Sequence, residues 1–240
     1  MLIYFSKDPE RALAEFHRSG YFVAPNVLSD GFCDSLIAAA QRFSSAVEGH
    51  FRPVMHPHLL DPLFMRALSH PEIVVVMNSI LRGKVDGLQT EFFYGRPGVR
   101  GFAPHQDNFF VEAEDSTFAS AWIALTDVGP DNGGLYGFPG THALGRLPVR
   151  RLQTGTVEGQ DPNANNEETV IPDGFASIDI TAPKGSVVFL HAYFVHGSHI
   201  NTSSDYRYAL LCTYIREGAH YRSGRYAQRA AIPLTFAQDT

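Results

Sequence analysis

The sequence predicts a mostly β fold preceded by helices, and two observations carry this prediction. Helical periodicity dominates residues 1–84, whereas from Val85 onward it gives way to short β runs broken by Gly, Pro, Asn and Asp. About eight such runs in succession are typical of a double-stranded β-helix, the jelly roll of cupin-like proteins. We therefore expect one domain over 1–240, in which the helices support a jelly-roll core over 85–216.

The N-terminal helices are indicated by caps and by apolar spacing. Asp8-Pro9-Glu10 combines a capping residue, a proline at the first helical position and an acidic first turn, and Gly20 is a typical stop. A second pattern, which begins at Asp30, keeps its apolar residues on one helical face. The predicted helices cover 9–19, 30–46, 61–69 and 71–81.

Short β runs follow, and one long polar stretch interrupts them. The predicted strands cover 87–94, 104–111, 118–126, 134–138, 175–180, 186–190, 193–195 and 207–216. The stretch 146–174 is rich in Gln, Glu, Asp and Asn, and a loop of this length inside a compact domain is usually functional or disordered. It is therefore either a lid over the mouth of a site or a mobile surface loop.

Composition narrows the class of protein. The net charge is -6 and basic residues form no block, so we expect no nucleic-acid partner. No apolar run reaches the length of a membrane span, and the first residues lack the pattern of a signal peptide. Cys33 and Cys212 have neither zinc nor disulfide spacing. We expect a cytoplasmic protein without a membrane partner, monomeric or homodimeric, that acts on a small molecule.

Three residues far apart in the sequence form a candidate metal site. His105 and Asp107 are separated by one residue, so on a strand both side chains point to the same face. His196 ends an apolar β run and can supply a third ligand from a neighbouring strand. Two imidazoles and one carboxylate are the ligands of a facial Fe(II) site, which leaves coordination positions open. Arg207, further along the chain, suits a dicarboxylate co-substrate.

Ordered sequence blocks accompany these residues. They are FFYGRP at 92–97, PHQD at 104–107, AWIALTD at 121–127, NGGL at 132–135, FPGTH at 138–142, KGSVVF at 184–189 and HGS at 196–198. Alone, a His-x-Asp pair is common and His196 is typical of a core histidine. Together with the blocks, the chain from about Gln89 to Arg216 resembles the phytanoyl-CoA dioxygenase family of Fe(II)/2-oxoglutarate-dependent oxygenases.

The resemblance implies an activity and roles for individual residues. The cofactors would be Fe(II), 2-oxoglutarate and O2, and the reaction would be the hydroxylation of a small metabolite or natural-product intermediate with release of succinate and CO2. His105, Asp107 and His196 would hold the iron. The residues that would bind 2-oxoglutarate are Arg207, Ser198, Trp122 and Gln89. Related halogenases replace the carboxylate of Asp107 with a small residue, so its presence implies hydroxylation rather than halogenation.

Substrate contacts are predicted beside the metal strand and at the mouth of the site. The candidates are Asn108, Phe109, Arg96, Tyr136 and His142, with Arg100 and Arg146 nearby. Two alternatives to an enzyme remain open. A non-catalytic sensor of the metal or of 2-oxoglutarate would bind without turnover, whereas an interaction protein on a degenerate jelly roll would have lost at least one ligand. The intact set of four residues speaks against the second alternative.

Overall fold

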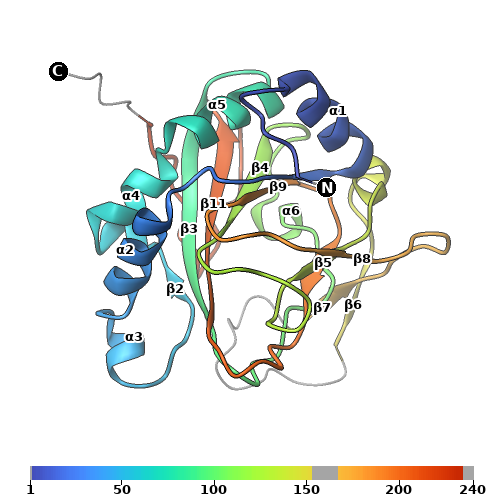
Figure 1. Cartoon of the computed structure of the whole chain (residues 1–240). Helices are drawn as coiled ribbons and strands as arrows, with labels where there is room; N and C mark the ends of the chain where they lie inside the picture. The colour runs from blue at the N-terminus through green and yellow to red at the C-terminus, as the bar shows by residue number, and fades with distance from the viewer. Residues whose placement is uncertain (1, 153–166, 235–240) are drawn as a thin grey trace.

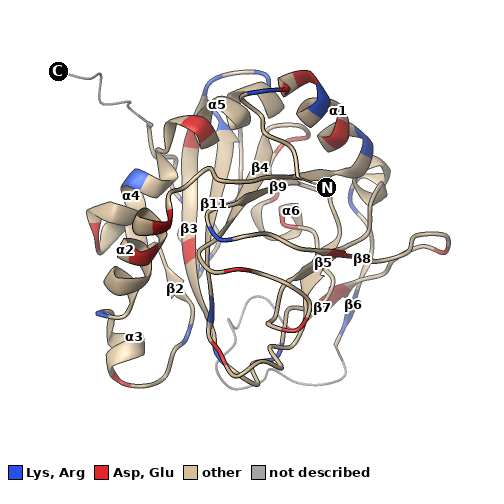
Figure 2. Cartoon of the chain, in the orientation of Figure 1, with Lys and Arg blue, Asp and Glu red and all other residues tan. Residues whose placement is uncertain are grey.

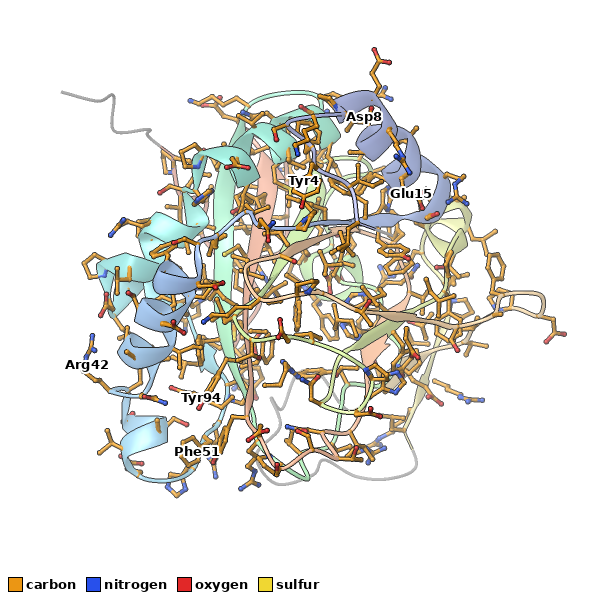
Figure 3. The ribbon with its side chains drawn as sticks, viewed as in Figure 1. Tyr4, Asp8, Glu15, Arg42, Phe51 and Tyr94 are labelled. Carbon is orange, nitrogen blue, oxygen red and sulfur yellow. The ribbon has the colours of Figure 1, made fainter. Side chains whose placement is uncertain are left out.

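The computed structural model describes residues 2–152 and 167–234, and Figure 1 shows their arrangement. Asp8, which is labelled in Figure 3, caps the first helix by accepting a hydrogen bond from the Arg11 N–H at 3.0 Å, and Gly20 ends the helix with a φ of 85°. The helices of the N-terminal part are α1 (Pro9–Ser19), α2 (Asp30–Ala40), α3 (Ser44–Val47), α4 (Pro62–Leu68) and α5 (Pro71–Ile80), with the 3-10 helix η1 (Pro57–Leu59) before α4.

The described strands form three antiparallel sheets. The largest has the order β1-β9-β4-β11-β3-β2, formed by β1 (Tyr21–Ala24), β9 (Val187–His191), β4 (Phe118–Ala124), β11 (Arg207–Arg216), β3 (Val85–Gly95) and β2 (Val54–Met55). The second has the order β10-β5-β8, formed by β10 (His196–Ser198), β5 (Leu135–Gly137) and β8 (Ile178–Ile180). A separate ribbon pairs β6 (Val149–Arg151) with β7 (Glu167–Thr169).

The six-stranded sheet forms the middle layer of the molecule. On β4, Ala121 and Ile123 join a core cluster that contains residues of α2, α4 and α5, whereas Trp122 packs with Leu135 and Ile180 of the three-stranded sheet. Figure 1 likewise shows α2 and α4 on one side of β3 and the strands β5 and β8 on the other. Because both faces of the sheet are covered, every residue of β4 is buried. Two facing antiparallel sheets after N-terminal helices confirm the predicted jelly roll.

The register of β11 determines where along the strand each of its side chains lies relative to residues of β3 and β4. Arg207 pairs with Gly95 near one end of the strand, whereas Thr213 lies between Gln89 on β3 and Ser120 on β4. Arg207 and Thr213 are six residues apart on one strand, which corresponds to about 20 Å along it. The backbone of Arg207 therefore lies far along β11 from Thr213, the residue that pairs with Ser120.

The predicted strand over 104–111 is wrong. His105 makes an isolated bridge to His196, and the chain then turns into the short helix α6 (Asn108–Val111). The side chain of Asn108 explains this turn, because it donates to the Ala113 carbonyl at 3.0 Å and accepts from the Ala113 N–H at 2.8 Å. A side chain that satisfies the local backbone in this way competes with strand pairing.

Smaller differences concern the boundaries of elements. The predicted helix over 30–46 is divided into α2 and α3, and the strand predicted at 193–195 lies at β10 instead. Four strands (β1, β2, β6 and β7) were not predicted, because each is short. In addition, β1 and β2 pair with segments that are distant in the sequence, whereas β6 and β7 pair with each other. The predicted loop over 146–174 contains β6 and β7. Its middle part, 153–166, lies outside the described residues, so its role as a lid stays a prediction.

Charged residues of both signs are distributed over the helices and connecting segments (Figure 2). None of the described helices is both long and apolar enough to cross a membrane.

Candidate active site

His105, Asp107 and His196 converge on one point between the two sheets. Each offers one ligand atom, and these atoms all lie within 4.8 Å of one another. The Oδ1 atom of Asp107 is 3.5 Å from Nε2 of His105 and 3.7 Å from Nε2 of His196. Two imidazole nitrogens and one carboxylate oxygen at these separations can hold a single metal ion and leave one side of it open.

Backbone hydrogen bonds place the two histidines side by side. The N–H of each donates to the carbonyl of the other, at 2.8 Å and 3.0 Å. The Nδ1 atoms then face carbonyls of their own chain segments, that of Ala103 at 2.8 Å and that of Phe194 at 3.1 Å. Because Nδ1 is occupied as a donor in each ring, Nε2 is the atom available to a metal, which is the usual arrangement of ligating histidines.

The charge states of these side chains also suit a metal. Burial alone would raise the pKa of Asp107, but His196 and His105, together with a hydrogen bond of 2.6 Å that Ser120 donates to Oδ2, hold that pKa below its ordinary value. Burial, reinforced by the neighbouring His105, lowers the pKa of His196 to about 4. At neutral pH the group is therefore an ionised carboxylate beside a neutral imidazole, the forms in which both side chains bind metals.

Arg207 places a buried cation in the same cavity. Only 6% of this residue is exposed, its guanidinium carbon lies 5.5 Å from the centre of the Trp122 ring, and its Nε has no hydrogen-bond partner among the described residues. Burial lowers its pKa to about 10, so it stays charged at neutral pH. Gly95 makes room for it, because a Cβ there would lie 3.0 Å from the Arg207 Nε. A buried guanidinium of this kind is suited to a carboxylate ligand.

One cavity of about 340 Å³ connects these groups. Its walls include the three candidate metal ligands and all four residues expected to bind 2-oxoglutarate, which are Arg207, Ser198, Trp122 and Gln89. The Oε1 atom of Gln89 is buried without a hydrogen-bond partner among the described residues. We call the part of the cavity between the metal ligands and Arg207 its inner end.

The mouth of the cavity is formed by a segment that sequence reasoning did not identify. Residues 221–229, which we call the C-terminal strap, follow β11 and contribute several arginines to the lining. Arg222 is held by Glu112 at 3.2 Å and donates to the carbonyls of Phe109 and Phe110 at 3.3 Å and 3.1 Å. At the other end of the strap, the imidazole of His56 contacts the carbonyl of Ala227. The strap contains no motif, and the richness in arginine of 222–229 was its one signal in the sequence.

The structure does not bring the predicted substrate contacts to the described walls of this cavity. Asn108 is buried in the turn described above, and the Nε2 of His142 is 3.0 Å from the carbonyl of His17. Arg96, Phe109 and Tyr136 do not line the cavity either. Their neighbours Phe110 and Val111 do, because α6 turns them inward. The segment after Asp107 therefore contributes residues other than the predicted ones to the cavity wall, because a helix lies where a strand was expected.

Comparison with known proteins identifies the family. The sequence model described as phytanoyl-CoA dioxygenase (PhyH) matches residues 16–209, which is most of the chain. The chain belongs to the phytanoyl-CoA dioxygenase family. This is a family of Fe/2-oxoglutarate-dependent oxygenases, so the predicted family and the predicted cofactors, iron and 2-oxoglutarate, are confirmed.

Proteins with similar sequences include dioxygenases that are named after different substrates. A phytanoyl-CoA dioxygenase of Arabidopsis thaliana is 30% identical over 180 residues, which are 73% of this chain and 61% of the plant protein. An ectoine dioxygenase of Stutzerimonas stutzeri is 27% identical over 227 residues, which are 83% of this chain and 74% of the bacterial protein. This dioxygenase-family chain thus spans less than two thirds of the length of the plant relative.

Solved structures share the fold of this family member. The epimerase SnoN in complex with Fe3+, alpha ketoglutarate and nogalamycin RO has a TM-score of 0.75 at 21% identity, and the match covers 97% of both chains. EctD from S. alaskensis with 2-oxoglutarate and 5-hydroxyectoine has a TM-score of 0.70 at 19% identity, covering 93% of this chain and 84% of that one. These likenesses confirm the fold class.

Proposed function

We propose that this chain is an Fe(II)- and 2-oxoglutarate-dependent dioxygenase that oxidises a small organic molecule, with hydroxylation as its reaction. The observation that carries the proposal is the convergence of His105, Asp107 and His196 at one place in a cavity whose wall also contains the buried cation Arg207. A metal ion and an anionic co-substrate would meet in this inner end. No other group of three metal-ligating side chains was found among the described residues.

The donor set fits Fe(II) and leaves room for other ligands. His105 and His196 would bind through Nε2 and Asp107 through Oδ1, while the Ser120 hydrogen bond holds the second carboxylate oxygen away. Bound iron supplies the chemistry that activates dioxygen at the expense of 2-oxoglutarate. What the protein contributes is the orientation of three ligands on one side and a cavity whose other walls are largely apolar.

Arg207 would bind the distal carboxylate of 2-oxoglutarate. Its guanidinium is buried, charged and lacks an ion-pair partner among the described residues, and its planar donors match a carboxylate in a bidentate way. Trp122 lies beside it and Ser198 lines the same inner end, where the Ser198 hydroxyl accepts a hydrogen bond from the Phe102 N–H at 2.9 Å. That hydroxyl still has its own proton to donate to a carboxylate oxygen. Gln89 would add a contact from β3.

The carboxylate of Asp107 supports hydroxylation over halogenation. Asp107 occupies the position that a halogenase would leave open for halide, so the site favours transfer of oxygen to carbon. Solved structures of the same fold include the alpha ketoglutarate dependent epimerase SnoN and the carbocyclase SnoK, both from nogalamycin biosynthesis. The outcome of oxidation in this fold therefore depends on how the substrate is placed, which in this chain is set by the walls near the mouth.

Anaerobic titration of the apoprotein with Fe(II) and 2-oxoglutarate tests this function. The complex is expected to develop the visible charge-transfer band of the iron chelate, and admission of oxygen is expected to yield succinate, even without a substrate. Binding without any succinate, also in the presence of a broad panel of substrates, would indicate a sensor instead. Absence of both the band and succinate would contradict the iron site itself.

A further inference from the structure

Gln89 carries a buried hydrogen-bond acceptor that the iron and co-substrate sites do not satisfy. The residue is 5% exposed and lines the cavity, and its Oε1 has no hydrogen-bond partner among the described residues. The ionised carboxylates and the keto group of 2-oxoglutarate are themselves acceptors, so the co-substrate can use the amide nitrogen of Gln89 but not Oε1. A buried acceptor without a donor is unfavourable. Oε1 therefore marks a place where a ligand with a donor would be stabilised.

The register of the central sheet puts Gln89 in one row with the support of the metal site. Thr213 of β11 pairs with Gln89 of β3 on one side and with Ser120 of β4 on the other. Paired residues of antiparallel strands lie on the same face, and we call these three residues the polar row. The Ser120 hydroxyl donates to Asp107 at 2.6 Å. Because neighbouring strands are about 4.8 Å apart, the row extends over about 10 Å from the support of Asp107 to Gln89, a distance that a small molecule can span.

Thr213 adds a second neutral group beside Gln89. It is 4% exposed and lines the cavity, and its hydroxyl donates to the carbonyl of Gln89 at 3.4 Å, which is longer than an ordinary O–H···O bond. Since a hydroxyl rotates, its proton can turn to a better acceptor. A ligand hydroxyl can then donate to Oε1 of Gln89 and accept from Thr213 at the same time.

The charged side chains on the cavity wall beyond the inner end do not belong to the polar row. Glu91 and Arg229 both line the cavity, and both interact with other groups of the protein. Arg222 is held by Glu112 at 3.2 Å, and Arg225 is exposed to water, where its charge is screened. A charged group of a ligand at the row would lose its hydration among neutral partners. The polar row therefore favours a neutral donor.

Apolar side chains line the cavity beside the polar row. Phe118 precedes Ser120 by two residues on β4, so both lie on the same face, and Phe118 shares an apolar cluster with Val111 of α6. Both apolar residues line the cavity, as does Phe110, whose ring centre is 6.1 Å from that of His105. A carbon body that packs on these side chains would gain from the burial of its apolar surface, while a hydroxyl at the row would determine its direction.

We propose that Gln89 and Thr213 bind a hydroxyl group of the substrate, and that the substrates are neutral alcohols with an apolar carbon body. This inference rests on the proposed function, because it takes the iron site as the place of reaction. Gln89 and Thr213 would then be specificity-determining residues that direct the carbon atoms near the hydroxyl towards the metal ligands.

Calorimetric titration of the anaerobic Fe(II) protein at saturating 2-oxoglutarate with four ring compounds of similar size tests the inference. Cyclohexanol offers a donor, cyclohexanone offers only an acceptor, and cyclohexylammonium chloride and sodium cyclohexanecarboxylate carry opposite charges. We expect cyclohexanol to bind about tenfold or more tightly than each of the other three, because only a neutral donor satisfies the buried oxygen of Gln89 without the burial of a charge.

Two variants separate the members of the polar row. Gln89→Leu should reduce the ratio of the affinities for cyclohexanol and cyclohexanone by about fivefold or more, because it removes the acceptor that distinguishes an alcohol from a ketone. A merely structural role would weaken the binding of both compounds and leave their ratio unchanged. Thr213→Val should weaken the binding of cyclohexanol by about fivefold. Thr169→Val is its matched control, since Thr169 is also 4% exposed but does not line the cavity.

The outcomes distinguish this inference from the proposed function. Wild-type protein that binds Fe(II) and 2-oxoglutarate, but binds cyclohexanone or a charged probe as tightly as cyclohexanol, would overturn the role of the polar row and leave the oxygenase function in place. Failure of cyclohexanol to bind would overturn that role as well, as would an unchanged ratio in Gln89→Leu or equal weakening by Thr213→Val and Thr169→Val. Failure of the wild type to bind 2-oxoglutarate would contradict the proposed function, and the inference would fall with it. Thermal unfolding of each variant verifies that it is folded.

Discussion

The inner end of the cavity and its mouth are built in different ways. At the inner end, Asp107 is held by Ser120 of a central strand, and Arg207 belongs to β11, which is paired on both sides. The mouth is formed by the C-terminal strap, whose position depends on side-chain contacts such as that between Arg222 and Glu112. A rigid sheet suits groups that must keep a fixed geometry around a metal, whereas a strap can change its sequence without disturbing them. The comparison predicts large, general effects from variants of the inner end and smaller, substrate-specific effects from those of the mouth.

The largest effect is expected from Asp107→Ala. Loss of one of three candidate ligands, and of the only one that is charged, should reduce succinate formation by about 100-fold or more, because metal affinity and ligand geometry fall together. Iron content after gel filtration and succinate yield are the measurements. Asp86→Ala removes a buried carboxylate elsewhere and should retain iron. Iron retention by Asp107→Ala equal to that of the wild type would show that the metal lies elsewhere.

Arg207→Gln should act on the co-substrate. Loss of a buried charge that pairs with a carboxylate is expected to raise the KM for 2-oxoglutarate by about 100-fold, with a smaller change in kcat at saturation. Because Trp122 is the single tryptophan and lies beside Arg207, its fluorescence should report the binding directly. Arg216→Gln, on the same strand but outside the cavity lining, is the control. An unchanged KM would remove Arg207 from the co-substrate site.

Ser120→Ala tests the support of the metal ligand. The Ser120 hydroxyl donates to Asp107 Oδ2 at 2.6 Å, and loss of such a partner typically costs about 10–100-fold in metal affinity or activity. Competition with a chelator measures the affinity for Fe(II). Ser186→Ala is a suitable control, since Ser186 is equally buried and its hydroxyl has no hydrogen-bond partner among the described residues. Equal losses in both variants would mean that packing, rather than orientation of Asp107, is responsible.

Arg222→Gln should have a smaller effect that is confined to the mouth. It removes the ion pair with Glu112 and loosens the attachment of the strap to the carbonyls of Phe109 and Phe110. We expect the KM for the organic substrate to rise several-fold while that for 2-oxoglutarate stays the same, because an exposed ion pair contributes about 1 kcal/mol or less. Steady-state kinetics with each substrate varied in turn would show this. A rise in both KM values would contradict the separation of the two ends.

The stability of the fold should depend on pH through His58. Burial, with the neighbouring His56, lowers the pKa of His58 to about 4 from an ordinary value of 6.5. Between these values the unfolded chain binds a proton that the folded chain does not, so stability is complete above pH 6.5 and falls as the pH decreases. At pH 5.5 the loss attributable to His58 is about 1.4 kcal/mol. Urea unfolding at pH 7 and pH 5.5 measures the total pH dependence, to which His191 also contributes because burial lowers its pKa to about 4 as well. The part of the difference that His58→Gln removes is the contribution of His58.

The inner end could be predicted because its chemistry depends on residue types and order. Two histidines and one aspartate in ordered blocks, with one arginine after them, were enough to predict the candidate residues that line one cavity in the structure, although the reason given for His105 and Asp107 was wrong. The expected strand would have put both side chains on one face, whereas Asp107 has a helical backbone, with φ −58° and ψ −37°. They converge because the chain turns at α6 while the backbone of His105 pairs with that of His196.

The sequence by itself determined the fold class, the family, four candidate residues that the structure places in one cavity, and Asp8 as the cap of the first helix. Only the tertiary structure decided what surrounds the substrate. The strap reaches the cavity through contacts between Arg222 and Phe109 and between His56 and Ala227, pairs that are more than 100 residues apart and carry no periodic signal. Glu91 likewise reads as an ordinary strand residue until the register of β3 turns it inward. Local patterns predict local structure and strongly constrained chemistry, whereas a binding wall is formed by whichever distant segments folding brings together.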